Sequence, residues 1–199
     1  MADLNALKGN VADWLKAARA NPLFSRGLLG AAAVASLDQV AKYVIVHVVN
    51  LQDRVVPCAK KPDDFCRQIA VSPIFDLTYV ENRGASFGML AGGAASRVFL
   101  TLLSIAVASF LVSWLARIHR PLSAAAVALI IGGAIGNLID RLRFGYVVDF
   151  LDFSGLFFPW VFNVADASIN VGIALLVVDW RRERSAARKK LSKDAAAGG

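Results

Sequence analysis

Residues that build metal sites and catalytic triads are scarce in this sequence, which has only two histidines and two cysteines among its 199 residues. His47, the histidine nearest to Cys58 and Cys66, belongs to a different segment, and no ligand set at metal-site spacing accompanies the two cysteines. No serine stands in a recognisable nucleophile motif, and both histidines are too remote for an obvious triad. We therefore expect no metal site, no cofactor and no serine-histidine hydrolysis.

Charged residues are also few, at 19% of the chain, whereas 57% of the residues are hydrophobic. The mean hydropathy of +0.54 is too apolar for a soluble domain of this size, and the chain is too short for several domains. No internal repeat is apparent, and the only biased block is the tail rich in lysine, arginine and alanine. The composition predicts a small integral membrane protein.

Four apolar segments are long enough to cross a membrane, because about 20 helical residues span a hydrocarbon core of ~30 Å. The predicted spans are residues 28–49, 96–116, 122–139 and 161–180. The expected fold class is an all-α membrane protein, a four-transmembrane-helix bundle with a small β region outside the cytoplasm. The first span is too long for a signal peptide and lacks a cleavage site, so we interpret it as a retained anchor.

The distribution of lysine and arginine predicts the orientation in the membrane. Thirteen of these residues lie in the segments 1–27, 117–120 and 181–199, and eight lie in the segments 50–97 and 140–160. By the positive-inside rule, both termini are cytoplasmic. A basic tail beside an anionic leaflet accounts for the net charge of +7, so we expect membrane lipids, and no nucleic acid, as its partner.

This orientation divides the chain into three parts. Residues 1–27 form a cytoplasmic extension, residues 28–180 form the membrane domain with outer loops at 50–95 and 140–160, and residues 181–199 form a basic cytoplasmic tail. In the extension, Val11, Trp14, Leu15 and Ala18 recur at helical spacing, which predicts an amphipathic helix on the membrane surface. A partly ordered extension without a role in chemistry is the alternative.

The loop at 50–95 contains a strand pattern and both cysteines. In the stretch PIFDLTYVENRG, Phe75, Leu77 and Tyr79 alternate with more polar neighbours and a turn follows, which predicts a small sheet on the outer membrane surface. Cys58 and Cys66 lie outside the cytoplasm, where oxidation is possible. We interpret them as a disulfide, and two free thiols are the alternative.

Charged and polar residues also occur within the predicted spans. Asp38 and Lys42 are four residues apart and share a helix face, so they favour a structural ion pair. In the third span, Gly132 and Gly136 form a small-residue pattern that permits close helix packing. In the same span Gly133, Asn137 and Asp140 share a face, and Asn163, Asp166 and Asn170 do so in the fourth, with Asp166 five residues inside the membrane.

Two carboxylates at the outer ends of these spans suggest acid-base chemistry. Neighbouring carboxyl groups share a proton, so the ionised one takes a proton from water while the protonated one polarises a carbonyl, as in an aspartic protease. Asp140, Asp149 and Asp152 are the candidate partners of Asp166. Arg141 is expected to neutralise Asp140, and Asp152 is expected to face water, so spacing favours Asp149.

Five stretches then carry a specific resemblance: DQVAK at 38–42, ENRGASFG at 81–88, GNLIDR at 136–141, VVDF at 147–150 and FNVAD at 162–166. In this order, the chain from about 28 to 180 resembles the lipoprotein signal peptidase (signal peptidase II) family. The resemblance implies an aspartic endopeptidase of the bacterial inner membrane with its active site near the periplasmic face. It would cut prolipoproteins on the amino side of a diacylglyceryl-modified cysteine, and globomycin-like compounds would inhibit it.

The resemblance also implies residue roles. The catalytic pair would be Asp149 and Asp166, and the first-helix pair would be Asp38 and Lys42. Residues implied in shaping the pocket and binding substrate are Asn82, Arg83, Asn137, Asp140, Arg141 and Asn163. The longer N-terminus and an insertion at about 52–70 depart from the family pattern. Two other classes stay open: a proton- or ion-coupled carrier, against which the lack of repeats argues, and a non-catalytic membrane adaptor.

Overall fold

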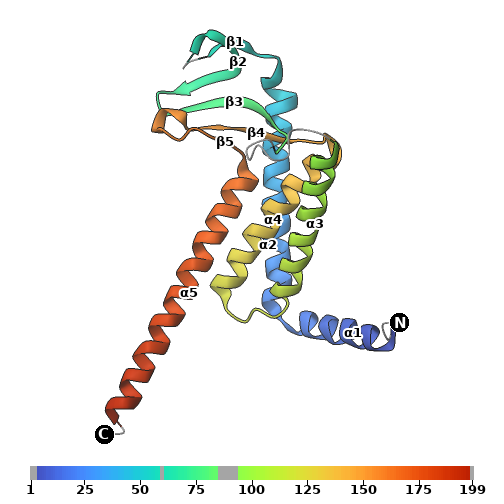
Figure 1. The fold of residues 1–199 in the computed structure, drawn as a ribbon, viewed down its shortest axis with the longest axis vertical. Coiled ribbons are helices and arrows are strands. Elements are labelled where there is room, and N and C mark those ends of the chain that lie inside the picture. Colours follow the sequence, from blue (N-terminus) through green and yellow to red (C-terminus); the bar gives the residue numbers. More distant parts are fainter. Residues whose placement is uncertain (1–3, 59–60, 85–93, 198–199) are drawn as a thin grey trace.

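The computed structural model describes residues 4–58, 61–84 and 94–197, so residues 85–88 of the ENRGASFG stretch lie outside the described part. Five α-helices account for most of the chain (Figure 1). They are α1 (Leu4–Ala20), α2 (Pro22–Tyr43), α3 (Ala94–Leu115), α4 (Pro121–Arg143) and α5 (Val164–Ala197). A π-helical turn, η1 (Val44–Val48), extends α2, and short 3-10 turns occupy η2 (Leu51–Asp53) and η4 (Ser154–Leu156).

Among the described residues, three helices have the length and apolar composition of a membrane span. They are Pro22–Val48, Ala95–Leu115 and Pro121–Arg143, close to the first three predicted spans. The predicted fourth span falls in α5, where Asp166 and Asn170 near the start and Asp179 further on lower the apolar character. The passage of α5 through the membrane therefore remains a prediction from the sequence.

Two helix boundaries differ from the predicted ones. The first spanning helix begins at Pro22 instead of residue 28, because the Asn21 side chain caps it by accepting the backbone N–H of Leu23 at 3.0 Å. The last helix begins at Val164 instead of residue 161, because Asn163 accepts the N–H of Asp166 at 2.9 Å. Asp166 therefore lies in the first turn of α5, two residues after its start, and the predicted helix start at residue 161 is wrong.

Small residues allow α4 to pack closely against its neighbours. A Cβ atom on Gly132 would lie 2.6 Å from the carbonyl oxygen of Ala31 in α2, and one on Gly136 would lie 2.6 Å from Asp38 Oδ2. The sequence prediction of close packing at these glycines is confirmed. Gly133 faces the other side, where its Cβ would lie 2.4 Å from the carbonyl oxygen of Ala165 in α5.

An antiparallel sheet of five strands in the order β1-β2-β3-β4-β5 covers one end of the helix bundle (Figure 1). Its strands are β1 (Val55–Cys58), β2 (Lys61–Ser72), β3 (Phe75–Asn82), β4 (Val147–Asp152) and β5 (Val161–Phe162). The strand predicted from the alternating pattern is β3, and the fold class of a helical membrane protein with a small β region is confirmed. The sheet also includes β4, which lies in the 140–160 segment, and β5, which follows it directly. No strand was predicted in either place.

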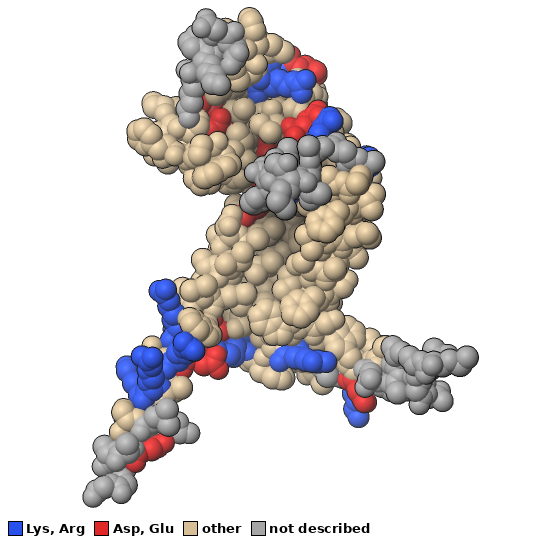
Figure 2. Space-filling view, in the orientation of Figure 1, with Lys and Arg blue, Asp and Glu red and all other residues tan. Residues whose placement is uncertain are grey.

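We call the end that carries the sheet the outer end, and the opposite end, where α1 and both termini lie, the inner end (Figure 1). Here α1 runs sideways from the foot of α2 (Figure 1), and the Trp14 ring is edge-on to Phe24 at 5.9 Å. Asn21 Nδ2 donates to the backbone oxygens of Ala116 and Ile118 just after α3. Figure 2 shows lysine and arginine gathered at the inner end and tail, with a mostly uncharged band above them.

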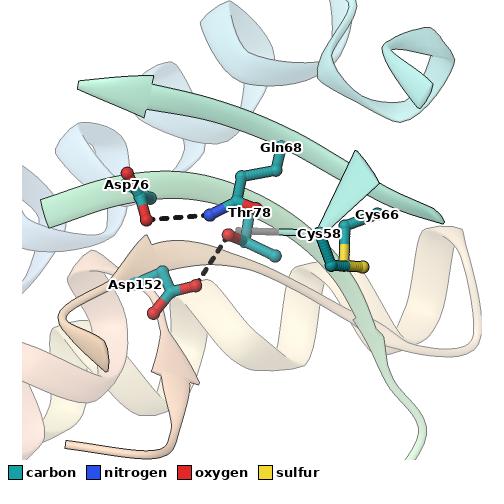
Figure 3. The surroundings of a disulfide bond; sticks show 6 residues. All are labelled: Cys58, Cys66, Gln68, Asp76, Thr78 and Asp152. Carbon is teal, nitrogen blue, oxygen red and sulfur yellow. Dashed lines mark hydrogen bonds between the residues drawn. A yellow bond between two sulfur atoms is a disulfide. The ribbon is translucent and has the colours of Figure 1, made fainter. Parts of the chain in front are cut away.

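A disulfide joins Cys58 at the end of β1 to Cys66 in β2 (Figure 3). The neighbouring strands carry two polar pairs, with Gln68 donating to Asp76 at 2.8 Å and Thr78 donating to Asp152 at 2.7 Å. Asp152 is buried, so the prediction that it faces water is wrong. The pairing of β3 with β4 places Asp152 opposite Asp76, where its side chain accepts the Thr78 hydroxyl.

Candidate active site

Asp149 lies in the middle of β4 at the junction between the sheet and the helices. It is 1% exposed, and it stands opposite Val80 of β3 in the strand register. Two amides hold its carboxyl group: Asn82 Nδ2 donates to Oδ2 at 2.9 Å, and Asn163 Nδ2 donates to Oδ1 at 2.6 Å. The sheet therefore fixes this carboxyl group away from solvent with a donor on each oxygen.

Asp166 approaches the same place from α5. Its backbone N–H donates to Asn163 Oδ1, and its Oδ1 atom accepts from Asn137 Nδ2 of α4 at 2.7 Å. Asn163 thus contacts both aspartates, because its nitrogen binds the Asp149 carboxyl group while its oxygen caps the turn that carries Asp166. We refer to Asp149 and Asp166 as the aspartate pair. Asn163 also donates to Asn137 Oδ1 at 3.1 Å, which links the two asparagines.

Burial raises the pKa of Asp149 to about 7, and the negative charge of Asp166 adds to the rise. Hydrogen bonds from Asn82 and Asn163 act in the opposite direction, but burial is the larger effect. Near neutral pH, Asp149 therefore keeps a proton that an ordinary aspartate has lost. A protonated carboxyl group next to a second carboxyl group is the arrangement that acid-base hydrolysis requires.

A buried ion cluster lies next to the aspartate pair. Lys42 Nζ is 2.8 Å from both Asp38 Oδ2 and Asp140 Oδ2, and it donates to Asn137 Oδ1 at 3.2 Å. The two carboxylates also accept backbone N–H groups, Asp38 from Ala165 at 2.9 Å and Asp140 from Val148 at 3.1 Å. The cluster therefore ties α2 to α4, to the start of α5 and to β4.

This cluster corrects the predicted partner of Asp140. The sequence predicted that Arg141 neutralises Asp140, but the cation in contact is Lys42. Neighbouring residues on a helix point about 100° apart, and the close approach of α2 at Gly136 brings Lys42 to the Asp140 side of α4. Arg141 instead donates to the backbone oxygen of Asn137 at 3.4 Å and interacts electrostatically with the aspartate pair.

The remaining predicted site residue, Arg83, lies at the exposed rim. Its guanidinium group is 2.6 Å from Glu81 and 5.7 Å from the ring centroid of Tyr146. Sequence reasoning assigned no role to Gln39, whose Nε2 donates to Asp140 at 2.8 Å and to the backbone oxygen of Gly136 at 3.1 Å. The signal for it was its place three residues before Lys42, on the same helix face.

Comparison with known proteins bears on what this arrangement does. A profile of the family described as Signal peptidase (SPase) II matches residues 30–182. The chain belongs to the lipoprotein signal peptidase family. The "Lipoprotein signal peptidase" of Caulobacter vibrioides is 46% identical over 150 residues, which cover 75% of this chain and 82% of that one. The protein of the same name from Cupriavidus necator is 42% identical over 168 residues, covering 82% and 86%.

A solved structure shares the fold of this lipoprotein signal peptidase family member. It is described as a bacterial membrane enzyme, is 27% identical, and aligns with a TM-score of 0.65 over 81% of this chain and 91% of its own. The family resemblance seen in the five sequence stretches is therefore confirmed. The protein is a multi-pass enzyme of a bacterial membrane, an aspartic endopeptidase with lipoprotein signal peptidase activity.

Proposed function

We propose that the aspartate pair, Asp149 and Asp166, is the catalytic group with which this enzyme cleaves prolipoproteins on the amino side of a diacylglyceryl-modified cysteine. One observation carries this proposal. Two linked asparagines at the outer end of the bundle hold a carboxyl group from β4 beside one from α5: Asn163 donates to the Asp149 carboxyl group, and Asn137, which accepts from Asn163, donates to that of Asp166. No cofactor takes part in the reaction that we propose.

The environment of each carboxyl group supports a division of roles. Asp149 holds a proton near neutral pH, so it serves as the acid that donates a hydrogen bond to the oxygen of the scissile carbonyl. Asp166 serves as the base that takes a proton from the attacking water. When the intermediate collapses, the peptide C–N bond breaks and the base returns its proton to the leaving amine.

The other site residues support the pair or the substrate. Asn82, Asn137 and Asn163 donate to its carboxyl groups, and Arg141 provides a positive charge beside them. We propose that Arg83, exposed at the rim, contacts the polar part of the substrate. Asp140 holds β4 through Val148, and Asp38 and Lys42 form the structural pair that keeps α2 against α4 and α5.

We propose that the outer end faces the periplasm and that both termini are cytoplasmic in the inner membrane. The gathering of lysine and arginine at the inner end supports this orientation (Figure 2). It divides the chain into a cytoplasmic extension (1–27), a membrane domain (28–180) and a cytoplasmic tail (181–199). In α1, Val11 and Leu15 are 52% and 41% exposed, as expected for apolar side chains that contact lipid.

The test is cleavage of a purified diacylglyceryl-modified prolipoprotein in detergent, with the unmodified precursor as a control. Wild-type protein is expected to cut before the modified cysteine, and Asp166→Asn or added globomycin is expected to abolish the cut. Appreciable turnover by folded Asp166→Asn would overturn the catalytic pair. No cleavage by folded wild type would favour a proton- or ion-coupled carrier, which proton flux in liposomes tests.

A further inference from the structure

Three asparagines around the aspartate pair share one hydrogen-bonding pattern. Each donates through its amide nitrogen to a carboxyl group of the pair, Asn82 and Asn163 to Asp149, and Asn137 to Asp166. Each also accepts a hydrogen bond through its amide oxygen. The donors on that side are the Gly84 N–H for Asn82, the Asp166 N–H for Asn163 and the Lys42 ammonium for Asn137, at 3.0, 2.9 and 3.2 Å, and Asn163 Nδ2 is a second donor to Asn137 Oδ1 at 3.1 Å.

This pattern matters because the two ends of a side-chain amide are similar in shape but opposite in hydrogen bonding. A rotation of 180° exchanges the NH₂ donor for the carbonyl acceptor. A backbone N–H and a lysine ammonium are donors only, so the group that faces them must be the amide oxygen. Each such donor therefore directs the nitrogen of its asparagine toward a carboxyl group of the aspartate pair.

Asn137 differs from the other two asparagines because both of its donors are side chains. One of them, Asn163 Nδ2, has two N–H groups for three acceptors, Asp149 Oδ1, Asn137 Oδ1 and the Val148 oxygen. Lys42, by contrast, has enough N–H groups for its acceptors. It is 4% exposed, and its three N–H groups match three acceptors, Asp38, Asp140 and Asn137 Oδ1. Neutralising two carboxylates would not require the third contact. That contact extends the ion cluster to Asn137, whose nitrogen is 2.7 Å from Asp166 Oδ1.

We propose that Lys42 is a positioning residue for the peptidase reaction, because its ammonium group fixes the Asn137 amide in the orientation that donates to Asp166. This inference rests on the proposed catalytic role of Asp166. Without Lys42, only the Asn163 N–H that is shared with the Val148 oxygen holds the Asn137 oxygen. Asn137 can then turn its carbonyl oxygen toward Asp166, which removes the hydrogen bond that orients this carboxyl group. The chemical step then loses the orientation of its base, while substrate binding by the rest of the site is retained.

A double-mutant cycle of Lys42→Met and Asn137→Ala tests this role, with kcat and KM measured per folded molecule on a diacylglyceryl-modified prolipoprotein. Each single variant is expected to lower kcat about 10- to 100-fold with KM nearly unchanged, because each deprives the Asp166 carboxyl group of its hydrogen bond from Asn137. Because Lys42 acts through Asn137, the double variant is expected to be no slower than Asn137→Ala alone. A double variant whose loss equals the product of the two single losses would overturn the inference.

Met at position 42 leaves Asp38 and Asp140 without their cation, which destabilises the folded state. The cycle is therefore repeated in an Asp38→Asn background. Asn at position 38 retains an oxygen for the Ala165 N–H and removes one of the two buried charges. Asp166→Asn is assayed in parallel. Turnover by that variant would refute the proposed function itself, whereas an inactive Asp166→Asn together with additive losses in the cycle would refute only the role of Lys42.

Discussion

Helix α5 places an aspartate against α4 at each end of the bundle, but with different partners. At the inner end, Asp179 accepts hydrogen bonds from the Arg120 guanidinium at 2.8 Å and from the Ser123 hydroxyl, and it is 6% exposed. Arg120 also pairs with Glu183, one turn further along α5. At the outer end, Asp166 accepts from the neutral amide of Asn137.

In the proposed mechanism, one helix thus carries a structural carboxylate and a reactive one. The direct ion pair with a guanidinium and the hydrogen bond from Ser123 make Asp179 a link between two helices. Amide donors orient a carboxylate without cancelling its charge. Because Asp149 is buried nearby, the charge of Asp166 acts on a second carboxyl group, and the two can share a proton.

The largest expected effect tests this comparison directly. Asp166→Asn should lower kcat by about 10²–10⁴-fold, the usual contribution of a general base, while the unfolding temperature in detergent stays close to that of wild type. Asp179→Asn, the matched variant on the same helix, should retain kcat within a few-fold and lose about 1–2 kcal/mol of stability. Equal losses of kcat in the two variants would show that Asp166 and Asp179 do not differ in their role in the reaction.

Much of the outer end could be predicted from the sequence, because helical periodicity places Asn137 with Asp140 and Asn163 with Asp166. The alternating pattern likewise predicted β3. The partner of Asp140 could not be predicted, since its pairing with Lys42 depends on how closely α2 approaches α4. Local capping was also missed: Asn163 looked like part of a span but ends the strand region and starts α5.

Asp149 offers a second test, through the pH dependence of stability. Its folded pKa of about 7 lies above the ordinary value of 3.8, so the folded protein holds this proton more tightly than the unfolded chain. The stabilisation is fully present below about pH 4 and is lost as the pH rises through about 7, by up to about 4 kcal/mol. Asp149→Asn cannot titrate, so its stability relative to wild type should rise from pH 4 to pH 8.

Thermal unfolding of both proteins in detergent across this pH range measures the effect. Parallel curves for wild type and Asp149→Asn would show that Asp149 has no raised pKa. The same series with Asp166→Asn separates the two causes of the raised Asp149 pKa, which are burial and the negative charge of Asp166. Because burial is the larger one, most of the pH dependence should persist when the neighbouring charge is removed.

Two glycines allow a smaller perturbation at each end of the α4–α5 contact. A Cβ on Gly133 would lie 2.4 Å from the Ala165 oxygen, and one on Gly172 would lie 2.6 Å from the Ala126 oxygen. Because both clashes are with backbone, Gly133→Ala and Gly172→Ala should each cost about 3 kcal/mol of stability. Only Gly133→Ala should also lower kcat, about tenfold, because Ala165 adjoins Asp166.

Gly30→Ala is the control for these two variants, since its Cβ would meet the Ala128 Cβ at an ordinary 3.7 Å. It should leave both kcat and the unfolding temperature unchanged within error. A loss of kcat in Gly172→Ala as large as that in Gly133→Ala would show that the inner contact also controls the aspartate pair.

The disulfide tests how far the functional site extends through the sheet at the outer end. Cys58 and Cys66 join β1 to β2, whereas Asp149 lies on β4, with β3 between. Replacing both cysteines with serine frees a loop with a sequence separation of 8 and should lower stability by about 2–3 kcal/mol. The value of kcat per folded molecule should not change, because the amides that hold Asp149 come from Asn82 and Asn163. A fall in kcat would mean that loss of the disulfide between β1 and β2 changes the geometry of the aspartate pair. Reduction of this bond would then regulate the enzyme.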